Sequence, residues 1–499
     1  MSDPYDVVVV GGGPSGSTVA TLVARQGHRV LQVERERFPR YQIGESLLPA
    51  TVHGIGKLLG VTEELERARF VVKRGGTFRW GRNPTPWTFS FGASPRFAGD
   101  SSTAYQVERM RFDQILLDNA RRHGVEVVEE TTVHDVVEED GGVVGVVLSS
   151  ADGRRREVRC RWVVDASGNT SRIHQRVGGR RRYSEFFRNL ALFGYFEGGR
   201  RMPAPNQGNI VAAAFDSGWF WYIPLTDELT SVGAVVLPEA LDRVRGDREE
   251  ALTRLIQDCP MIAELLADAR RVTEGPYGEI RVRKDYSYIQ ERFWRPGLVL
   301  TGDAACFIDP VFSSGVHLAT YGALLAARSL NTVLRGDLDD TTAFEEFETR
   351  YRMEYTRFHD FLVGFYDMHQ DEESYFWRAK KVLGRQATSM ESFVELVGGG
   401  ASAELALVTP EAYAAQRQAA FQELADIVDQ PVEREGEDRD LLSSALAKDV
   451  ARAGARIQVH AATGDNLDET RPVRPGGLVP SADGFHWTPP VGATTEGKV

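Results

Sequence analysis

A glycine-rich turn directly after a short apolar strand constrains this chain more than any other feature. Residues 7–10 are four valines in a row, which predicts a parallel strand buried on both faces. The next six residues, from Gly11 to Gly16, follow the pattern G-x-G-x-x-G. A helix over 15–25 and a second strand over 29–33 come next. This order of strand, turn, helix and strand predicts a dinucleotide site at the start of an α/β fold.

The candidate dinucleotide contacts lie in this turn and at the end of the second strand. Glycines here allow the tight turn, the approach of the backbone to a pyrophosphate, and the packing of helix on strand. The N–H groups at the start of the helix would face that pyrophosphate. A carboxylate after the second strand can accept a hydrogen bond from a ribose. The predicted contacts are Gly11, Gly13, Ser15, Gly16 and Glu34, and the motif by itself does not distinguish FAD from NAD.

The composition argues against several other classes of protein. Of the 499 residues 59 are basic and 71 acidic, and the net charge of -12 argues against a nucleic-acid partner. The three cysteines are far apart in the sequence, which predicts neither a disulfide framework nor a metal site. No apolar stretch approaches the ~20 residues of a membrane span, and the first strand begins too early for a removable signal peptide. We therefore expect a cytoplasmic protein without a membrane span.

The order of strands and helices predicts how the chain is divided. Strands and helices alternate in the first third, which predicts a doubly wound parallel sheet. Alternating apolar and polar stretches further on predict an inserted antiparallel sheet. We expect a discontinuous nucleotide-binding domain over 1–190 and 275–335, the inserted sheet over 190–275, and a helical region over 336–460. The prolines and glycines of 461–499 predict an irregular surface tail.

Three separated segments together resemble one group of flavoproteins. They are the Gly11–Gly16 turn, the loop Asp165-Ala166-Ser167-Gly168, and Gly302-Asp303-Ala304. Their combination is similar to the FAD-binding pattern of the aromatic hydroxylase and geranylgeranyl reductase superfamily. The resemblance implies a Rossmann-like FAD-binding domain with an inserted antiparallel sheet and a helical C-terminal region. It also implies that Asp303 lies near the ribityl chain and that FAD is contacted by Arg40, Glu45, Ser46, Arg109, Pro310 and Gly315. The two arginines could instead form structural salt bridges, and the role of Asp285 stays open.

Two further motifs and one lysine resemble the flavin-dependent halogenases. Residues 218–224 match the pattern W-x-W-x-I-P, and residues 307–315 match F-x-x-P-x-x-S-x-G. Lys73 stands where that family carries its active-site lysine. The likeness is strongest to the subgroup acting on phenolic or aromatic-polyketide substrates, such as the chloramphenicol, chondrochloren and enediyne-pathway halogenases. Residues 311–313 lack the glutamate of tryptophan-specific members, which disfavours free tryptophan as the substrate.

The resemblance assigns a role to each of these residues. Trp219 and Trp221 point to one face of a strand, so their rings could block direct transfer of oxygen from flavin to substrate; the alternative is an ordinary aromatic core pair. Ser314 and Gly315 would open a helix whose N–H groups favour a halide, although serine there could simply cap the helix. Lys73 would relay the halogen from hypohalous acid to the substrate, and otherwise it would be a surface charge.

The resemblance also implies partners. We expect FADH2 from a separate flavin reductase, dioxygen, and chloride, bromide or iodide. The substrate would be an electron-rich aromatic in natural-product biosynthesis, free or tethered to an acyl carrier protein; the sequence identifies no base that would deprotonate a phenol. Two alternatives stay open: a single-component FAD-dependent aromatic monooxygenase, and a flavoenzyme similar to the geranylgeranyl reductases.

Overall fold

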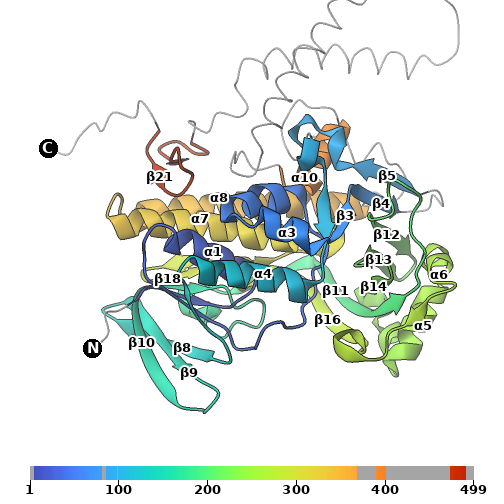
Figure 1. Cartoon of the computed structure of the whole chain (residues 1–499), viewed down its shortest axis with the longest axis horizontal. Coiled ribbons are helices and arrows are strands. Elements are labelled where there is room, and N and C mark those ends of the chain that lie inside the picture. The colour runs from blue at the N-terminus through green and yellow to red at the C-terminus, as the bar shows by residue number, and fades with distance from the viewer. Residues whose placement is uncertain (1–4, 81–85, 98, 368–388, 401–471, 491–499) are drawn as a thin grey trace, which may run out of the picture.

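The computed structural model describes residues 5–80, 86–97, 99–367, 389–400 and 472–490. Two β-sheets form the frame of the molecule, and the long helices α7 (Gly315–Arg335) and α8 (Asp340–Asp367) pack against each other beside them (Figure 1). The predicted α/β class is confirmed.

The first sheet contains the predicted dinucleotide-type strands. Its order is β17-β18-β10-β1-β2-β7, and β1 pairs in parallel with both β2 and β10. Val7, Val8 and Val9 are fully buried, as a run of valines without polar alternation requires. The strands are β1 (Tyr5–Val10), β2 (Val30–Val33), β7 (Glu126–Val128), β10 (Arg155–Asp165), β17 (Trp294–Arg295) and β18 (Leu298–Leu300), with the hairpin β8 (Thr132–Glu139) and β9 (Gly142–Ser149) attached to β10.

The second sheet is larger than the insertion expected over 190–275. Its order is β19-β16-β11-β14-β13-β12-β4-β5, with β15 paired to β11. Strands from before 190 and after 275 join it because β4 pairs with β12 and β16 pairs with β11, and local alternation cannot show which distant strands pair. The strands are β4 (Gly75–Arg79), β5 (Trp87–Ser90), β11 (Arg181–Glu197), β12 (Ile210–Phe215), β13 (Gly218–Pro224), β14 (Leu229–Val236), β15 (Arg270–Arg271), β16 (Arg281–Gln290) and β19 (Cys306–Phe307).

Helices cover both sheets. The helix α1 (Pro14–Ala24) packs between α7 and α4 (Arg109–Arg122), while α5 (Arg248–Gln257) and α6 (Pro260–Leu265) cover the second sheet with an apolar cluster of their own. A small pair, β3 (Val71–Lys73) with β6 (Ala104–Gln106), is separate from both large sheets. The other α-helices that the structure describes are α2 (Gly56–Leu59), α3 (Thr62–Ala68) and α10 (Ser389–Val397). The short helices are η1 (Ala50–Ile55), η2 (Phe91–Ala93), η3 (Pro95–Phe97), η4 (Gly99–Ser102), η5 (His174–Val177), η6 (Pro238–Val244), η7 (Gly275–Tyr277), η8 (Gly302–Ala304) and η9 (Pro310–Phe312).

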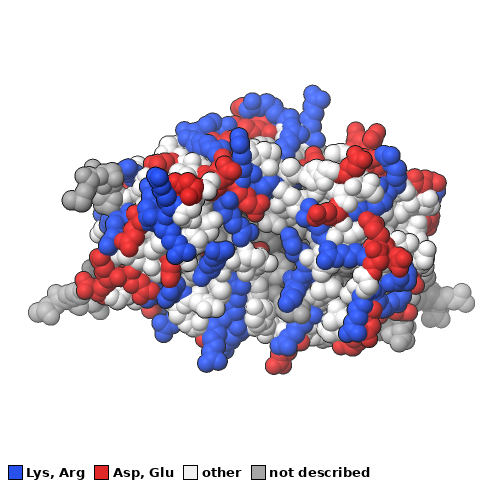
Figure 2. Space-filling view, turned by 90° about the horizontal axis from the view of Figure 1, so that it is seen from below, with Lys and Arg blue, Asp and Glu red and all other residues white. Residues whose placement is uncertain are grey.

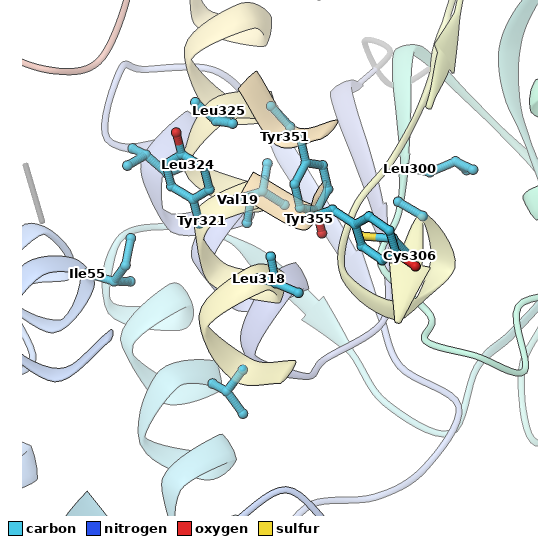
Figure 3. Close-up of a cluster of buried hydrophobic side chains, with 14 of the residues drawn as sticks. Val19, Ile55, Leu300, Cys306, Leu318, Tyr321, Leu324, Leu325, Tyr351 and Tyr355 are labelled. Carbon is cyan, nitrogen blue, oxygen red and sulfur yellow. The ribbon is translucent and has the colours of Figure 1, made fainter. Parts of the chain in front are cut away.

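The contact between α7 and α8 requires a glycine. A Cβ at Gly322 would lie 2.3 Å from the Tyr351 ring, so any other residue there would push the helices apart. Figure 3 shows the surrounding apolar cluster, which is built from α1 (Val19), α7 (Leu318, Leu324) and α8 (Tyr351, Tyr355). This packing fixes the N-terminus of α7, where a halide contact is expected.

The C-terminal tail differs from the expectation. Residues 472–490 contain a short hairpin, β20 (Val479–Pro480) and β21 (Trp487–Thr488), where an irregular surface tail is expected. Trp487 is 1% exposed, and its indole Nε1 donates to Ser329 Oγ at 2.9 Å. The buried Trp487 side chain holds the hairpin in place more than the two-residue strands do. Because the proline and glycine content of the segment gives no sign of this contact, the prediction of an irregular surface tail is wrong for these residues. Most of the expected helical region, 368–388 and 401–460, lies outside the described residues.

The surface, the helices and the cysteines each add one observation. On the face that Figure 2 shows, basic and acidic side chains are interspersed. The described residues include no helix long and apolar enough to cross a membrane, and no group of side chains suited to a metal ion. Cys160, Cys259 and Cys306 are buried and free.

Candidate active site

The glycine turn is shaped for close backbone contacts. A Cβ at Gly16 would lie 2.0 Å from the Gly11 carbonyl oxygen, and one at Gly11, where φ is +115°, would lie 2.4 Å from the Ala166 oxygen. At Gly13 a Cβ would meet only the Arg40 guanidinium, at 3.4 Å. Gly11 and Gly16 therefore serve the fold, whereas Gly13 leaves room for phosphates to approach the backbone and the N-terminus of α1.

Two acidic residues lie beside this turn. The buried Glu34 accepts a hydrogen bond from the Gly12 N–H at 2.6 Å. The hydroxyl of Ser15 donates to Thr301 at 2.8 Å and so holds the turn against the segment that carries Asp303. Burial raises the pKa of Asp303 to about 6, against the opposing charge of Arg109. The Asp303 carboxylate accepts no hydrogen bond within the described part of the chain, which leaves it available to the hydroxyls of a cofactor.

The second FAD motif keeps the turn in place. The Asp165 carboxylate accepts hydrogen bonds from Ser167 Oγ at 2.6 Å and Ser171 Oγ at 2.5 Å. These bonds fix the loop whose Ala166 oxygen contacts Gly11. Asp165 is therefore bound within its own loop.

Arg40 and Arg109 form salt bridges, the alternative to a flavin contact that the sequence left open. Arg109 donates to both Asp113 oxygens, at 2.7 and 2.9 Å, and Arg40 donates to Asp113 at 2.8 Å. Asp113 is fully buried and holds Arg40 beside Gly13. Sequence reasoning missed Asp113, although its four-residue spacing from Arg109 on a predicted helix is a usable signal.

Glu45 and Ser46 are buried with unsatisfied oxygens. Tyr195 donates to Glu45 Oε1 at 2.8 Å, while Glu45 Oε2 and Ser46 Oγ have no hydrogen-bond partner among the described residues. Burial raises the pKa of Glu45 to about 7. Buried polar atoms normally have partners, so these orphaned atoms fit a cofactor at this position.

The two tryptophans of the W-x-W motif lie side by side on β13. Their ring centroids are 6.3 Å apart, and both side chains are buried, Trp219 at 1% and Trp221 at 6% exposed. Trp219 Nε1 donates to the Tyr366 hydroxyl at 2.6 Å, and Tyr366 donates to Asp309 at 2.8 Å. Trp221 Nε1 donates to Ser231 at 3.1 Å. Each indole is thus held in a fixed orientation.

The start of α7 has the geometry expected of an anion contact. Ser314 is the N-cap and fully buried, and its hydroxyl has no partner among the described residues. A Cβ at Gly315 would meet nothing within 4 Å. Pro310, a predicted FAD contact, follows β19, which stops at Phe307, and opens η9 because its fixed φ suits a first helical position.

Lys73 is buried at the end of β3. Only 2% of its surface is exposed, and Nζ donates to the Leu47 carbonyl at 3.0 Å and lies 5.4 Å from the centre of the Phe91 ring. Desolvation lowers its pKa to about 7. The neighbouring Arg74, by contrast, is exposed.

An aromatic cluster connects Lys73 to the start of α7. Phe91 packs on Phe89, Phe89 on Phe393 of α10, and Phe393 on Phe312, which directly precedes Ser313. Sequence reasoning missed this cluster because its members come from β5, η2, η9 and α10. Among the described residues Lys73 forms no hydrogen bond with either tryptophan of the motif, and the side chain of Asp285 lies outside the described part of the chain.

The sequence of this chain is similar to those of known halogenases. The model of the tryptophan halogenase family matches residues 6–100 and 94–425. A tryptophan 2-halogenase of Chondromyces crocatus is 35% identical over 405 residues, which cover 79% of this chain and 75% of that protein. The flavin-dependent halogenase armH4 of Armillaria mellea is 33% identical over 415 residues, which cover 76% of each chain.

Two solved structures of halogenases are also similar to this chain. The myxobacterial chondrochloren halogenase CndH, described as a variant of FAD-dependent halogenases, is 49% identical with a TM-score of 0.74, over 97% of this chain and 100% of that one. The flavin-dependent halogenase CmlS is 28% identical with a TM-score of 0.71, over 98% of this chain and 84% of that one. The chain therefore belongs to the tryptophan halogenase family and is a flavin-dependent halogenase.

Proposed function

We propose that this enzyme uses FADH2, dioxygen and halide to form hypohalous acid, and that Lys73 directs the halogen to an electron-rich, phenolic aromatic. The observation that carries the proposal is the buried amine of Lys73, which lies against Phe91 and whose pKa of about 7 leaves a large share of it neutral at physiological pH. A neutral amine has a free electron pair for electrophilic halogen, whereas an exposed ammonium does not.

The flavin site would be formed by the turn and the residues packed around it. Gly13 and the α1 N-terminus would bind the phosphates, with Glu34 and Asp303 at ribose and ribityl hydroxyls. Bound FADH2 would supply the two electrons that reduce dioxygen. The orphaned Ser46 and Glu45 oxygens support a flavin contact there.

The tryptophans and the α7 N-terminus would decide between halogenation and hydroxylation. Trp219 and Trp221, each held by a hydrogen bond, would keep the substrate ring away from the flavin. Ser314 Oγ and the first N–H groups of α7, including that of Gly315, would bind the halide, since a helix N-terminus favours an anion. Pro310 would support the turn that leads into this helix.

Lys73 would hold the halogen on the substrate side. Its hydrogen bond to Leu47 fixes Nζ, and the Phe91 ring keeps water away from it. The aromatic cluster between Lys73 and Phe312 supports an aromatic substrate. The chondrochloren and CmlS halogenases are similar structures, which supports a role in natural-product biosynthesis, and a phenol tethered to an acyl carrier protein is included in the proposal.

The test is a reconstituted reaction with a separate flavin reductase, FAD, dioxygen and a panel of free and carrier-tethered phenols. Chloride, bromide and iodide are each added or omitted, and the products are identified by mass spectrometry. We expect halogenated phenol only when halide, oxygen and reductase are all present. A hydroxylated product that forms without halide would contradict the proposal and favour an aromatic monooxygenase.

A further inference from the structure

We propose that Tyr41, Tyr195 and Glu45 form a proton-transfer chain that leads from the protein surface to the flavin. The inference rests on the proposed function, because the need for a proton comes from that reaction. It assigns roles to two tyrosines on different elements, neither of which belongs to a sequence motif.

The three side chains form a continuous line of short hydrogen bonds. The hydroxyls of Tyr41 and Tyr195 are 2.6 Å apart, and the Tyr195 hydroxyl is 2.8 Å from Glu45 Oε1. Tyr41 is half-buried, while Tyr195 is completely buried and Glu45 is 2% exposed. The line therefore begins where water can reach it and ends in a water-excluded part of the protein.

The hydrogen bonds all point the same way. Tyr195 has one hydroxyl proton and donates it to Glu45, so Tyr41 must donate to the Tyr195 oxygen. Each hydroxyl can pass its proton toward Glu45 and accept a replacement proton from the preceding group in the line. The direction of the chain is thus inward, from the surface to the carboxyl group.

The free end of the chain lies among the predicted flavin contacts. Glu45 Oε2 is buried and accepts no hydrogen bond from the described residues. Arg109 lies within electrostatic reach of both Glu45 and Asp303. Ser231, which accepts the hydrogen bond of Trp221, is also beside the Glu45 carboxyl. The Glu45 carboxyl therefore lies beside the hydrogen-bond partner of Trp221 and shares the field of Arg109 with the expected ribityl contact, Asp303.

The groups around the chain allow Glu45 to exchange a proton near neutral pH. Burial raises its pKa to about 7, opposed by the hydroxyls of Ser231 and Tyr195 and the charge of Arg109, while Glu108 raises it further. Charged groups also face the outer end of the chain: Arg281, 3.8 Å from the centre of the Tyr41 ring, and Arg283. The ring of Tyr277 packs on Tyr195 at 4.5 Å, but its hydroxyl donates to Glu108, away from the line.

The proposed reaction needs such a proton. FADH2, dioxygen, halide and one proton give FAD, hypohalous acid and water, whereas halide-free oxidation gives FAD and hydrogen peroxide without that proton. The halide reaction thus consumes one proton more. Glu45 would give its carboxyl proton to the oxygen that leaves as water. Tyr195 would then give a proton to Glu45, Tyr41 would give one to Tyr195, and solvent would give one to Tyr41.

The test compares Tyr195→Phe, Tyr41→Phe and Glu45→Gln with Tyr277→Phe, which removes a hydroxyl from the same ring cluster without interrupting the line. Protein loaded with chemically reduced FAD is mixed with oxygen, with and without bromide, and flavin oxidation and hypobromous acid are followed. Interrupting the line should slow the bromide-dependent reaction by about 100-fold or more, with a much smaller effect when bromide is omitted. The dissociation constant for FAD should not change in Tyr195→Phe and Tyr41→Phe, whose hydroxyls are not among the predicted flavin contacts. Tyr277→Phe should match the wild type in all three measurements.

Infrared difference spectroscopy on the same FAD-loaded protein supplies a readout that does not depend on turnover. A band of a protonated carboxyl should disappear on titration through about pH 7, be missing in Glu45→Gln, and shift in Tyr195→Phe. Absence of the band, equal slowing with and without bromide, or an equal loss in Tyr277→Phe would overturn the chain. If the wild type forms no hypobromous acid but shows the carboxyl band, the proposed function is refuted, whereas the conclusion that Glu45 is a buried acid titrating near neutral pH still holds.

Discussion

Lys73 is buried without a carboxylate within salt-bridge distance among the described residues, a costly place for an ammonium group. Its folded-state pKa is about 7, against 10.5 when it is exposed. Between these values the unfolded chain binds more protons, so the stability of the wild type rises with pH. Below about pH 7 the lysine is charged in both states and this contribution is constant.

Replacing Lys73 with methionine should therefore stabilise the protein most at low pH. The advantage of Lys73→Met in free energy of unfolding should be constant below about pH 7 and fall by about 1.4 kcal/mol per pH unit from there to about pH 10. Chemical denaturation of both proteins at each pH gives the difference. The exposed Lys57, replaced by methionine, is the control. If the difference in free energy of unfolding between Lys73→Met and the wild type does not vary with pH, the amine of Lys73 is not desolvated.

Residue roles could be predicted only in part. The motifs mark Trp219, Trp221 and Lys73, but nothing local marks their hydrogen-bond partners Tyr366, Ser231 and Leu47. Those partners lie on other elements, up to 147 residues away in the case of Tyr366. A single sequence contains no information on which distant side chains meet.

At the scale of elements, the N-terminus of α7 was predictable because Ser314 and Gly315 fit N-cap and first-turn positions. Replacing Ser314 with alanine should raise the halide concentration needed for half-maximal rate by about 10- to 100-fold, the loss expected for one hydrogen bond to an anion. Steady-state rates at varied chloride, with FAD binding measured alongside, test this. An unchanged halide requirement would place the halide elsewhere.

The helix α8 positions Trp219 through Tyr366. Tyr366→Phe leaves a buried indole N–H unsatisfied and should lower the free energy of unfolding by about 1–3 kcal/mol. We also expect less halogenated product per dioxygen consumed, because a looser indole blocks the flavin less well. Tyr355→Phe on the same helix is the matched control. Equal coupling of oxygen to product in Tyr366→Phe and wild type would argue against a blocking role.

At the scale of the whole molecule, the parallel sheet followed from the valine strand and the glycine turn, whereas the extent of the second sheet and the C-terminal hairpin did not. The extent of the second sheet depends on pairing between strands far apart in the sequence, and the hairpin depends on the burial of Trp487. Trp487 lies under Arg328 and Arg350, at 5.2 and 5.1 Å from its ring, and joins the hairpin to α7 and α8.

Removing that tryptophan should destabilise the molecule without changing the site. We expect Trp487→Ala to lower the free energy of unfolding by about 3–5 kcal/mol and to leave the FAD dissociation constant unchanged. Denaturant unfolding and flavin titration measure the two quantities. Loss of FAD binding in the folded variant would show that the hairpin also supports the cofactor site.

In the proposed reaction, Lys73 directs the halogen after hypohalous acid has formed. The most direct measurement is a single turnover of Lys73→Ala loaded with reduced FAD, in the presence of dioxygen, bromide and a phenol, with a small diketone added in parallel reactions to trap free hypobromous acid. We expect the variant to oxidise its flavin and to brominate the trap like the wild type, but no longer to brominate the phenol at one position. Selective bromination of the phenol by the variant at the wild-type rate would show that Lys73 does not direct the halogen.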